Sequence, residues 1–171
     1  PDGYTRWDWQ GDYPINSYGV ALNIGHYVSY GETYQGMPLT YYTLPEDQDR
    51  SRAQFAQVPG MLAAFEHVLG PYPFRRDGYK LVQVPYAGME HQSAIAYGNG
   101  FANGYLNRDF TGVGISPRFD FIIVHESAHE YFGNAITAAD GADMWIHEAW
   151  GTYLESLYVE QRWGYADMLA Y

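Results

Sequence analysis

Residues 125–129 read His-Glu-Ser-Ala-His, and this pentapeptide constrains the fold more than any other feature of the chain. On a helix the two histidines are four positions apart, about 400° of rotation, so both imidazoles leave the same face one turn apart. At this spacing His125 and His129 can each bring a neutral nitrogen to within about 2.1 Å of one zinc ion. Glu126 lies about 100° around the helix, where a carboxylate can take a proton from a zinc-bound water. The chain must therefore present these three side chains to one site.

The residues on either side of the pentapeptide are apolar. The run Phe-Ile-Ile-Val at 121–124 precedes it, and Tyr131 and Phe132 follow it. A helix this apolar is expected to be buried, and buried histidine and glutamate side chains need partners. This argues against a surface helix that carries two histidines by chance.

A catalytic zinc needs a third protein ligand and one open position. Glu148 follows His129 after eighteen residues and is the natural candidate. The adjacent His147 points about 100° away on a helix, so both residues are not expected to bind one metal. Asp140 and Asp143 fall in a loop or at a helix cap, where acidic residues are ordinary. The sequence thus predicts one zinc ion held by the two histidines and Glu148.

Two further acids are candidates for supporting roles. Glu155 is seven residues beyond Glu148, two turns along the same helix face, where it can accept a hydrogen bond from a ligand imidazole. The alternative for Glu155 is a solvated helical glutamate. Glu90 lies between two expected strands, and a carboxylate beside a zinc cleft can pair with a cationic group of a substrate. From local sequence alone this second role is weak, because acids are common in turns.

The composition excludes several classes of function. The chain has no cysteine, so any metal must be held by histidines and carboxylates. The net charge of −11 and only 9 Lys and Arg argue against binding to nucleic acid. No stretch approaches the roughly 18 apolar residues of a membrane span. The compartment stays open: no signal peptide is visible, and the first residue is Pro.

The first part of the chain is expected to form short strands and then a helix. Strand-like segments before the first helix are Val20–Ile24, Tyr27–Tyr30 and Tyr41–Leu44. From Glu46 to about Leu69, apolar residues recur at steps of three and four, which predicts a helix with one apolar face. These residues are Phe55, Val58, Leu62, Phe65 and Leu69. Pro59-Gly60 is expected to kink or split this helix.

The second part is expected to hold two strands and two helices. The strands are residues 79–84 and 93–97, and a glycine-rich loop follows at 98–114. Ser116 as N-cap and Pro117 at the first helical position predict a helix that runs to about Phe132. Asp143 can cap a second helix over about 144–162. Helices joined by a short connection tend to pack together, which would return Glu148 to the histidines.

Taken together, these motifs resemble the gluzincin zinc aminopeptidases, the family that includes membrane alanyl aminopeptidases and leukotriene hydrolase. The spacing from the His-Glu-x-x-His motif to Glu148 carries the likeness, which covers about residues 42–163. Four further segments match the family: Gly70-Pro-Tyr-Pro-Phe74, Gly88-Met89-Glu90-His91, Tyr131-Phe132-Gly133-Asn134 and Trp145-Ile-His-Glu148-Ala-Trp-Gly-Thr-Tyr-Leu-Glu155.

The resemblance implies an α+β fold, a thermolysin-like catalytic lobe with a small sheet and zinc-binding helices. Residues 1–41 would be the end of an N-terminal β domain. Residues 42–171 would be the N-terminal part of a catalytic domain that is cut short at its C-terminus.

The resemblance also implies a role for each residue in the cleavage of N-terminal residues from peptides. The zinc ligands would be His125, His129 and Glu148, and Glu126 would be the general base and then the proton donor to the leaving amine. Glu90 would hold the free α-amine of the substrate. Gly88 and Met89 would contact the peptide through their backbone, and Glu155 would support a ligand imidazole.

Two departures from the family pattern bear on activity. His91 stands where the family's Gly-x-Met-Glu-Asn signature has asparagine. The family also uses a tyrosine well downstream of the zinc glutamate to stabilise the oxyanion, and only 23 residues follow Glu148, so the chain is expected to end before it. Losing one oxyanion donor typically costs about 100–1000-fold in rate.

Two alternatives stay open. A thermolysin-like endopeptidase shares the ligands and needs no amine-binding glutamate. A catalytically inert, zinc-binding fragment is the other.

Overall fold

Five strands form one sheet in the order β1-β2-β3-β5-β4, in a computed structural model that describes residues 3–171. The strands are β1 (Val28–Tyr34), β2 (Met37–Thr43), β3 (Tyr79–Gln83), β4 (Gly88–Met89) and β5 (Ile95–Tyr97). β2, β3 and β5 run parallel, whereas β1 and β4 pair antiparallel with their neighbours. The short β4 therefore forms one edge of the sheet, next to the segment that carries Glu90.

The first two strands form a tight hairpin. Gln35 and Gly36 connect them with φ values of 48° and 78°, the positive angles at both central positions that a type I′ turn requires. In β2 every second residue is buried, starting from Met37, so one face of the strand packs into the core.

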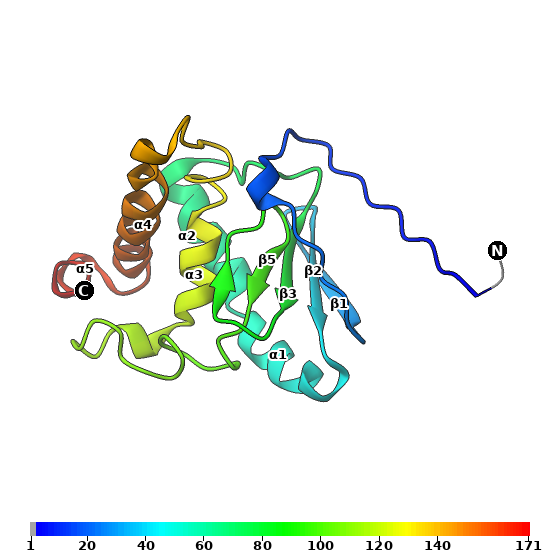
Figure 1. Ribbon diagram of the computed structural model, residues 1–171. Helices are drawn as coiled ribbons and strands as arrows, with labels where there is room; N and C mark the ends of the chain where they lie inside the picture. The colour runs from blue at the N-terminus through cyan, green and yellow to red at the C-terminus, as the bar shows by residue number, and fades with distance from the viewer. Residues whose placement is uncertain (1–2) are drawn as a thin grey trace.

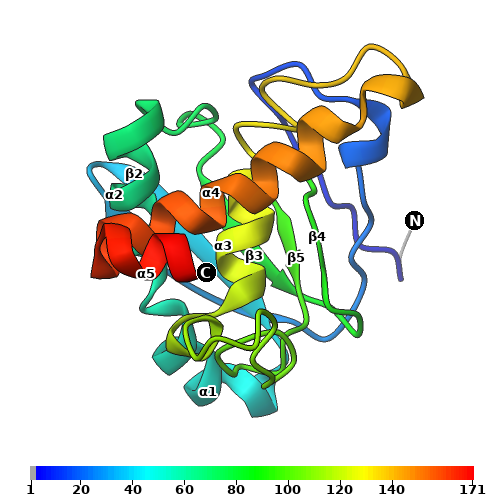
Figure 2. The ribbon, with the colours of Figure 1, turned by 90° about the vertical axis from the view of Figure 1, so that its left-hand side faces the viewer.

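The helices lie on one side of this sheet in two layers. They are α1 (Gln48–Phe55), α2 (Val58–Leu69), α3 (Phe121–Ala128), α4 (Trp145–Trp163) and α5 (Tyr165–Ala170), with 3-10 turns η1 (Ser17–Gly19), η2 (Pro45–Asp47), η3 (Ser116–Arg118) and η4 (Gly141–Asp143). α2 and α3 stand beside the sheet, and α4 lies beyond them (Figure 1). Figure 2 shows α4 crossing in front of α3, with the sheet behind both. α3 is thus enclosed between the sheet and α4.

The helix expected from Glu46 is split, as the sequence predicts, but the break comes earlier than Pro59. α1 ends at Phe55, and Pro59 lies in the first turn of α2, where its missing N–H costs no hydrogen bond. Four of the five residues of the predicted apolar face are buried, the exception being Leu69. The 3.6-residue period was therefore the right guide to the core face.

The helix that carries the His-Glu-Ser-Ala-His motif is shorter than predicted at both ends. Ser116 is not its N-cap: residues 116–118 form only η3, and the Ser116 hydroxyl donates to Asp109 at 2.6 Å. Phe119 then adopts an extended conformation, φ −145° and ψ 165°, which ends that turn. Asp120 caps α3 instead, since its carboxylate accepts the Ile123 N–H at 3.2 Å. α3 ends at Ala128, before the predicted end at Phe132.

Two other predictions need correction, and one strand was not predicted. Residues 20–24 form no strand, and their large apolar side chains are exposed because no neighbouring strand covers them. The two-residue β4 was not predicted, since it is too short to show an alternating pattern. Met144 holds the N-cap position of α4, and Asp143 belongs to the preceding turn η4, which Asp140 caps.

The predicted domain boundary at residue 41 falls within β2. Residues on both sides of it pair with β3 in the same sheet. The first two residues of the predicted 1–41 segment lie outside the described residues, and the division into two domains stays a prediction.

No helix among residues 3–171 combines the length and the apolar character that a membrane span requires.

Candidate metal centre

α3 and the first turn of α4 bring three donor side chains together. His125 lies near the end of α3, His129 occupies its C-cap, and Glu148 lies in the first turn of α4. The two Nε2 atoms are 3.2 Å apart, and Glu148 Oε2 is 3.5 Å from His125 Nε2 and 3.7 Å from His129 Nε2. Tetrahedral ligands at about 2.1 Å from zinc are about 3.4 Å from one another. The three atoms therefore form one face of a tetrahedron of the size that zinc needs.

The outer nitrogen of each imidazole already faces an acceptor. His125 Nδ1 lies 2.7 Å from Glu155 Oε1, and His129 Nδ1 lies 3.0 Å from the Phe132 carbonyl. In the neutral rings the proton therefore resides on Nδ1, so both Nε2 atoms direct lone pairs into the same space. Two lone pairs at 3.2 Å repel each other unless a cation lies between them. Two imidazoles and a carboxylate are a donor set that fits zinc.

Glu155 links the centre to the end of the chain. Its side chain is buried, with one oxygen on His125 Nδ1 and the other accepting the Tyr171 hydroxyl at 2.7 Å. Burial alone would lower the pKa of His125, but the Glu155 hydrogen bond and nearby carboxylates outweigh it and raise that pKa. For His129, burial and the neighbouring His125 charge lower the pKa. The supporting contact predicted for Glu155 is thus present in the geometry.

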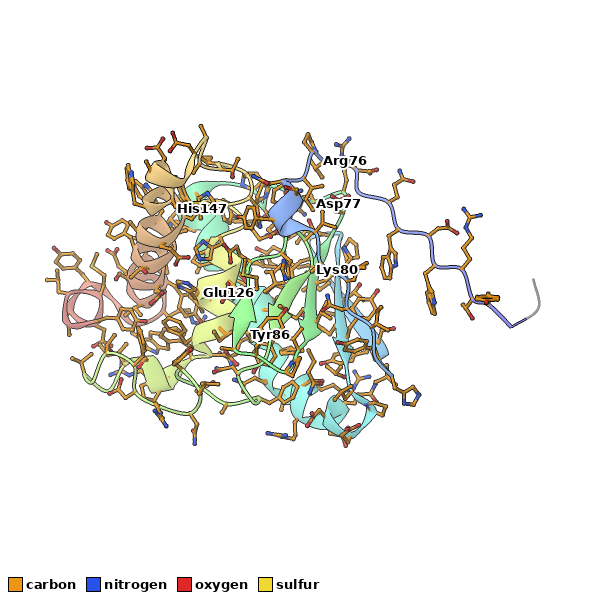
Figure 3. The ribbon with its side chains drawn as sticks, viewed as in Figure 1. Arg76, Asp77, Lys80, Tyr86, Glu126 and His147 are labelled. Carbon is orange, nitrogen blue, oxygen red and sulfur yellow. The ribbon has the colours of Figure 1, made fainter. Side chains whose placement is uncertain are left out.

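Glu126 lies beside the three donors, buried against β4. A Cβ added to Gly88 would come within 2.6 Å of Glu126 Oε1, so this carboxylate occupies the space that a side chain at position 88 would fill. Figure 3 labels Glu126 between α3 and the sheet edge. Burial raises its pKa to about 8, and the charges of Glu90 and Glu148 add to this shift while His125 opposes it. A base with a pKa near neutrality suits proton transfer at neutral pH.

Glu90 approaches the same centre from the edge of the sheet. It follows β4 directly, its side chain is only 7% exposed, and donor atoms of Glu90, Glu126 and His129 lie within 4.8 Å of one another. Two buried carboxylates this close repel each other, and a cationic group between them relieves the repulsion. Gly88 and Met89 form β4, at the sheet edge.

α4 approaches α3 closely because residue 151 is glycine. A Cβ at Gly151 would lie 2.7 Å from His129 Cε1 and 3.1 Å from His129 Nε2. Only a residue without a side chain lets the His129 imidazole take its place under α4.

His147 does not join the donor set, as predicted from its position on the helix. It is buried, and its Nε2 accepts the Ala138 N–H at 2.9 Å. Its ring stacks on Tyr18 of η1, with centroids 6.0 Å apart.

Sequence reasoning missed Tyr18, which brings the N-terminal segment against the residues that follow His129. Its hydroxyl donates to the Gly133 carbonyl at 3.2 Å. Burial, with the charges of Glu90, Glu130 and Glu148, raises its pKa to about 12. No local pattern marked this tyrosine among the 18 of the chain.

Sequence reasoning also missed Glu130, the residue after His129. It is completely buried, and burial raises its pKa to about 7 although hydrogen bonds from Tyr72, Ser93 and Asn134 oppose the shift. The charge of Lys80 on β3, labelled in Figure 3, also opposes it. A glutamate directly after a zinc motif gives no signal of burial by itself.

Comparison with known proteins agrees with this geometry. The model of the peptidase family M1 domain matches residues 55–170, about two thirds of the chain. Glutamyl aminopeptidase of Bos taurus is 25% identical over 98% of this chain, and aminopeptidase N of Canis lupus familiaris is 24% identical over 91%. The chain spans only 18% and 16% of the lengths of these two relatives.

Solved structures of similar fold come from the same group. An M1 zinc metallopeptidase of Deinococcus radiodurans, determined with a Tyr-Ser-Ala substrate, matches 90% of this chain and 33% of its own, with a TM-score of 0.61 and 22% identity. Native yeast LTA4 hydrolase matches 80% of this chain and 20% of its own, with a TM-score of 0.61 and 21% identity. At these identities the likeness establishes the fold, the α+β arrangement expected from the sequence.

Proposed function

The chain belongs to peptidase family M1, and from this premise we propose that it carries the zinc centre of an aminopeptidase that removes N-terminal residues from peptides. One observation carries the proposal. The Nε2 atoms of His125 and His129 and a Glu148 oxygen lie 3.2–3.7 Å apart, with both Nδ1 atoms already facing acceptors. The curated relatives with which the chain aligns are named as aminopeptidases.

In this proposal one zinc ion is held by His125, His129 and Glu148. When bound, zinc acts as a Lewis acid that lowers the pKa of a coordinated water toward about 7. Glu126 is the general base: its carboxylate takes a proton from the water that attacks the scissile carbonyl carbon, and then gives it to the leaving amine as the C–N bond breaks. Its position against Gly88, beside the donor atoms and away from bulk water, supports this role. Glu155 orients the His125 imidazole through its contact with Nδ1, the ring nitrogen that does not bind the metal.

Glu90 holds the free α-amine of the substrate, which limits cleavage to the first peptide bond. The support is electrostatic, because the buried carboxyl groups of Glu90 and Glu126 lie close together and an ammonium group beside them would offset their negative charge. Gly88 and Met89 bind the peptide backbone. β4 is an edge strand, and edge strands offer backbone groups to an extended peptide.

We propose that this chain works as part of a longer protein, since it spans only 18% and 16% of the two aminopeptidases named above. Residues 1–41 are then the end of an N-terminal β domain, and residues 42–171 are the first part of the catalytic domain.

Metal analysis of purified variants tests the ligands. The wild type is expected to bind one zinc ion, and His125→Ala and Glu148→Ala to lose it, while Glu126→Gln keeps zinc and loses turnover. His67→Ala is the matched control, because His67 is an exposed histidine on α2. A normal zinc content in His125→Ala would remove the ligand assignment.

Blocked substrates test the reaction. Free-amine peptides should be cleaved and their N-acetylated forms should resist. Equal cleavage of both forms would identify an endopeptidase instead, and zinc binding with no cleavage of either would identify an inert zinc-binding fragment.

A further inference from the structure

Glu130 lies at the centre of a buried hydrogen-bond network that the proposed chemistry does not use. Its carboxylate accepts hydrogen bonds from three side-chain or backbone donors: the Tyr72 hydroxyl, the Ser93 N–H at 3.1 and 3.2 Å, and the Asn134 Nδ2 at 2.8 Å. A carboxylate with no exposed surface needs such partners, so the three donors account for its burial.

Two of these donors are connected to the segment that carries Glu90: Ser93 is part of it, and Asn134 forms a hydrogen bond with it. Asn134 Nδ2 donates to the Glu90 carbonyl at 2.9 Å as well as to Glu130. Ser93 lies three residues after Glu90, so Glu130 and Asn134 hold the segment 90–93 at both of its ends. The backbone N–H of Asn134 is itself bonded to the His129 carbonyl at 2.9 Å.

The held segment has a conformation that needs support. Ser93 has a φ of 59°, in the left-handed region that side-chain-bearing residues rarely adopt. The turn is closed by the Ala94 N–H on the His91 carbonyl at 3.0 Å. Because Ser93 donates its N–H to Glu130, the buried carboxylate stabilises this unusual turn directly.

The Glu90 carboxylate is buried and closely surrounded by residues of the centre. It lies with Glu126 and His129 in a cluster whose donor atoms are within 4.8 Å of one another. A shift of the backbone that carries Glu90 would therefore change the distance from its carboxylate to His129.

We propose that Glu130 is a positioning residue, which holds Glu90 at a fixed distance from the metal-binding histidines so that it can receive a substrate amine. The inference rests on the amine-binding role proposed above for Glu90. Glu130 touches neither substrate nor metal in this account, and it acts only through Ser93 and Asn134.

The test is a double-mutant cycle read out by amine discrimination. The zinc-loaded Glu126→Gln protein serves as background, so that peptides bind and are not cleaved. Calorimetry gives the dissociation constants of Ala-Ala-Ala and N-acetyl-Ala-Ala-Ala. The dissociation constant of the acetylated peptide divided by that of the free-amine peptide measures recognition of the free amine. Glu130→Gln replaces an acceptor oxygen with an N–H group that faces other donors, so the ratio should fall by about tenfold. Glu90→Ala should abolish discrimination, and Glu130→Gln should then have no further effect.

Tyr72→Phe is the matched control. It removes one hydrogen bond from Glu130 but leaves those to Ser93 and Asn134, so it should keep the ratio of the background protein. If Glu130→Gln does not fold, as judged by zinc content and circular dichroism, Asn134→Ser takes its place with the same expected loss.

The outcomes distinguish the amine-binding role of Glu90 from the positioning role of Glu130. Unchanged discrimination in Glu90→Ala would overturn the proposed role of Glu90, and this inference with it. A loss in Glu90→Ala but none in Glu130→Gln would overturn the inference alone. The inference would also be overturned if Glu130→Gln changed the discrimination just as much in the Glu90→Ala protein. The same holds if Tyr72→Phe lowered the discrimination as much as Glu130→Gln.

Discussion

At the scale of single residues, the centre depends as much on two missing side chains as on the acids and histidines that are present. Gly151 leaves room for the His129 imidazole, and Gly88 leaves room for the Glu126 carboxylate. These two glycines touch residues with different proposed roles, one in metal binding and one in proton transfer. Adding one methyl group at each position should therefore separate the two roles.

Gly151→Ala is expected to weaken zinc binding at least about tenfold, because the new Cβ would lie 2.7 Å from His129 Cε1 and force the imidazole to move. The metal-free protein should not gain stability, because the clash with the buried His129 ring, which costs about 1–3 kcal/mol, offsets the roughly 1 kcal/mol that alanine adds in helix propensity. Zinc titration by calorimetry measures the first effect, and urea unfolding of the metal-free protein measures the second. Unchanged zinc affinity would contradict the close packing of α4 on His129.

Gly88→Ala is expected to lower kcat by about 100-fold or more while zinc content stays normal, because its Cβ would lie 2.6 Å from Glu126 Oε1 and displace the base. Steady-state kinetics and metal analysis on the same sample check this. Gly60→Ala is the control for both variants, since the nearest contact of its Cβ is 3.6 Å away, at Arg162 Nη1. A Gly88→Ala enzyme with normal kcat would argue against Glu126 as the base.

At the scale of elements, the sequence predicted the features that follow from the periodicity of apolar residues and from the spacing of the histidines and glutamates. The apolar face of α2 follows a 3.6-residue period, and the spacing from His129 to Glu148 identified the three donors that the fold brings together. The predicted ends of α3 were wrong. Ser116-Pro117 is a good local helix start, but Asp120 also caps locally and has remote hydrogen-bond donors that the sequence does not reveal. Tyr18 and Glu130 were missed for the same reason, since their partners are remote in sequence: Tyr18 bonds to Gly133, and Glu130 to Tyr72 and Ser93.

Asp120 fixes the start of α3 and should give its stability a particular pH dependence. Its carboxylate accepts Tyr97 Oη at 2.6 Å, Gln54 Nε2 at 2.7 Å, Asn99 Nδ2 at 2.8 Å and the Ile123 N–H at 3.2 Å. Burial nevertheless raises its pKa above the ordinary value, since desolvation outweighs these bonds. An acid whose pKa is raised in the folded state contributes stability that is complete below its unfolded pKa of about 4 and is lost as pH rises through the folded pKa.

Asp120→Asn should therefore be destabilising at every pH, because it turns an acceptor oxygen into a donor, and its cost should be largest near pH 4 and shrink toward pH 8. Urea unfolding of the metal-free wild type and variant at several pH values gives the difference in free energy. If the stability cost of Asp120→Asn grew with pH, the pKa of Asp120 would be lowered by folding instead of raised, and the folded state would favour the ionised carboxylate.

At the scale of the whole molecule, the centre joins layers that are also held together by packing and by buried hydrogen bonds, such as the 2.7 Å bond between Tyr79 and Ser127. The histidines come from α3, Glu148 from α4 and Glu90 from the edge of the sheet, so a bound cation would cross-link the layers. It would also relieve repulsion among carboxylates in a chain with a net charge of −11. This arrangement makes the stability of the fold a direct measure of metal binding.

Zinc is expected to stabilise the folded chain, because only the folded state sets the three donor atoms 3.2–3.7 Å apart. A ligand that binds only the folded state adds about 4 kcal/mol when its free concentration is about 1,000 times Kd. The urea midpoint should therefore rise in zinc relative to EDTA, and the slope of the transition should stay the same, since the surface exposed on unfolding does not change. His125→Ala should unfold at one midpoint in both conditions, which separates binding at this centre from adsorption elsewhere. If zinc raised the midpoints of the wild type and His125→Ala equally, the stabilising ion would bind outside the centre, and the three donors would not be its ligands.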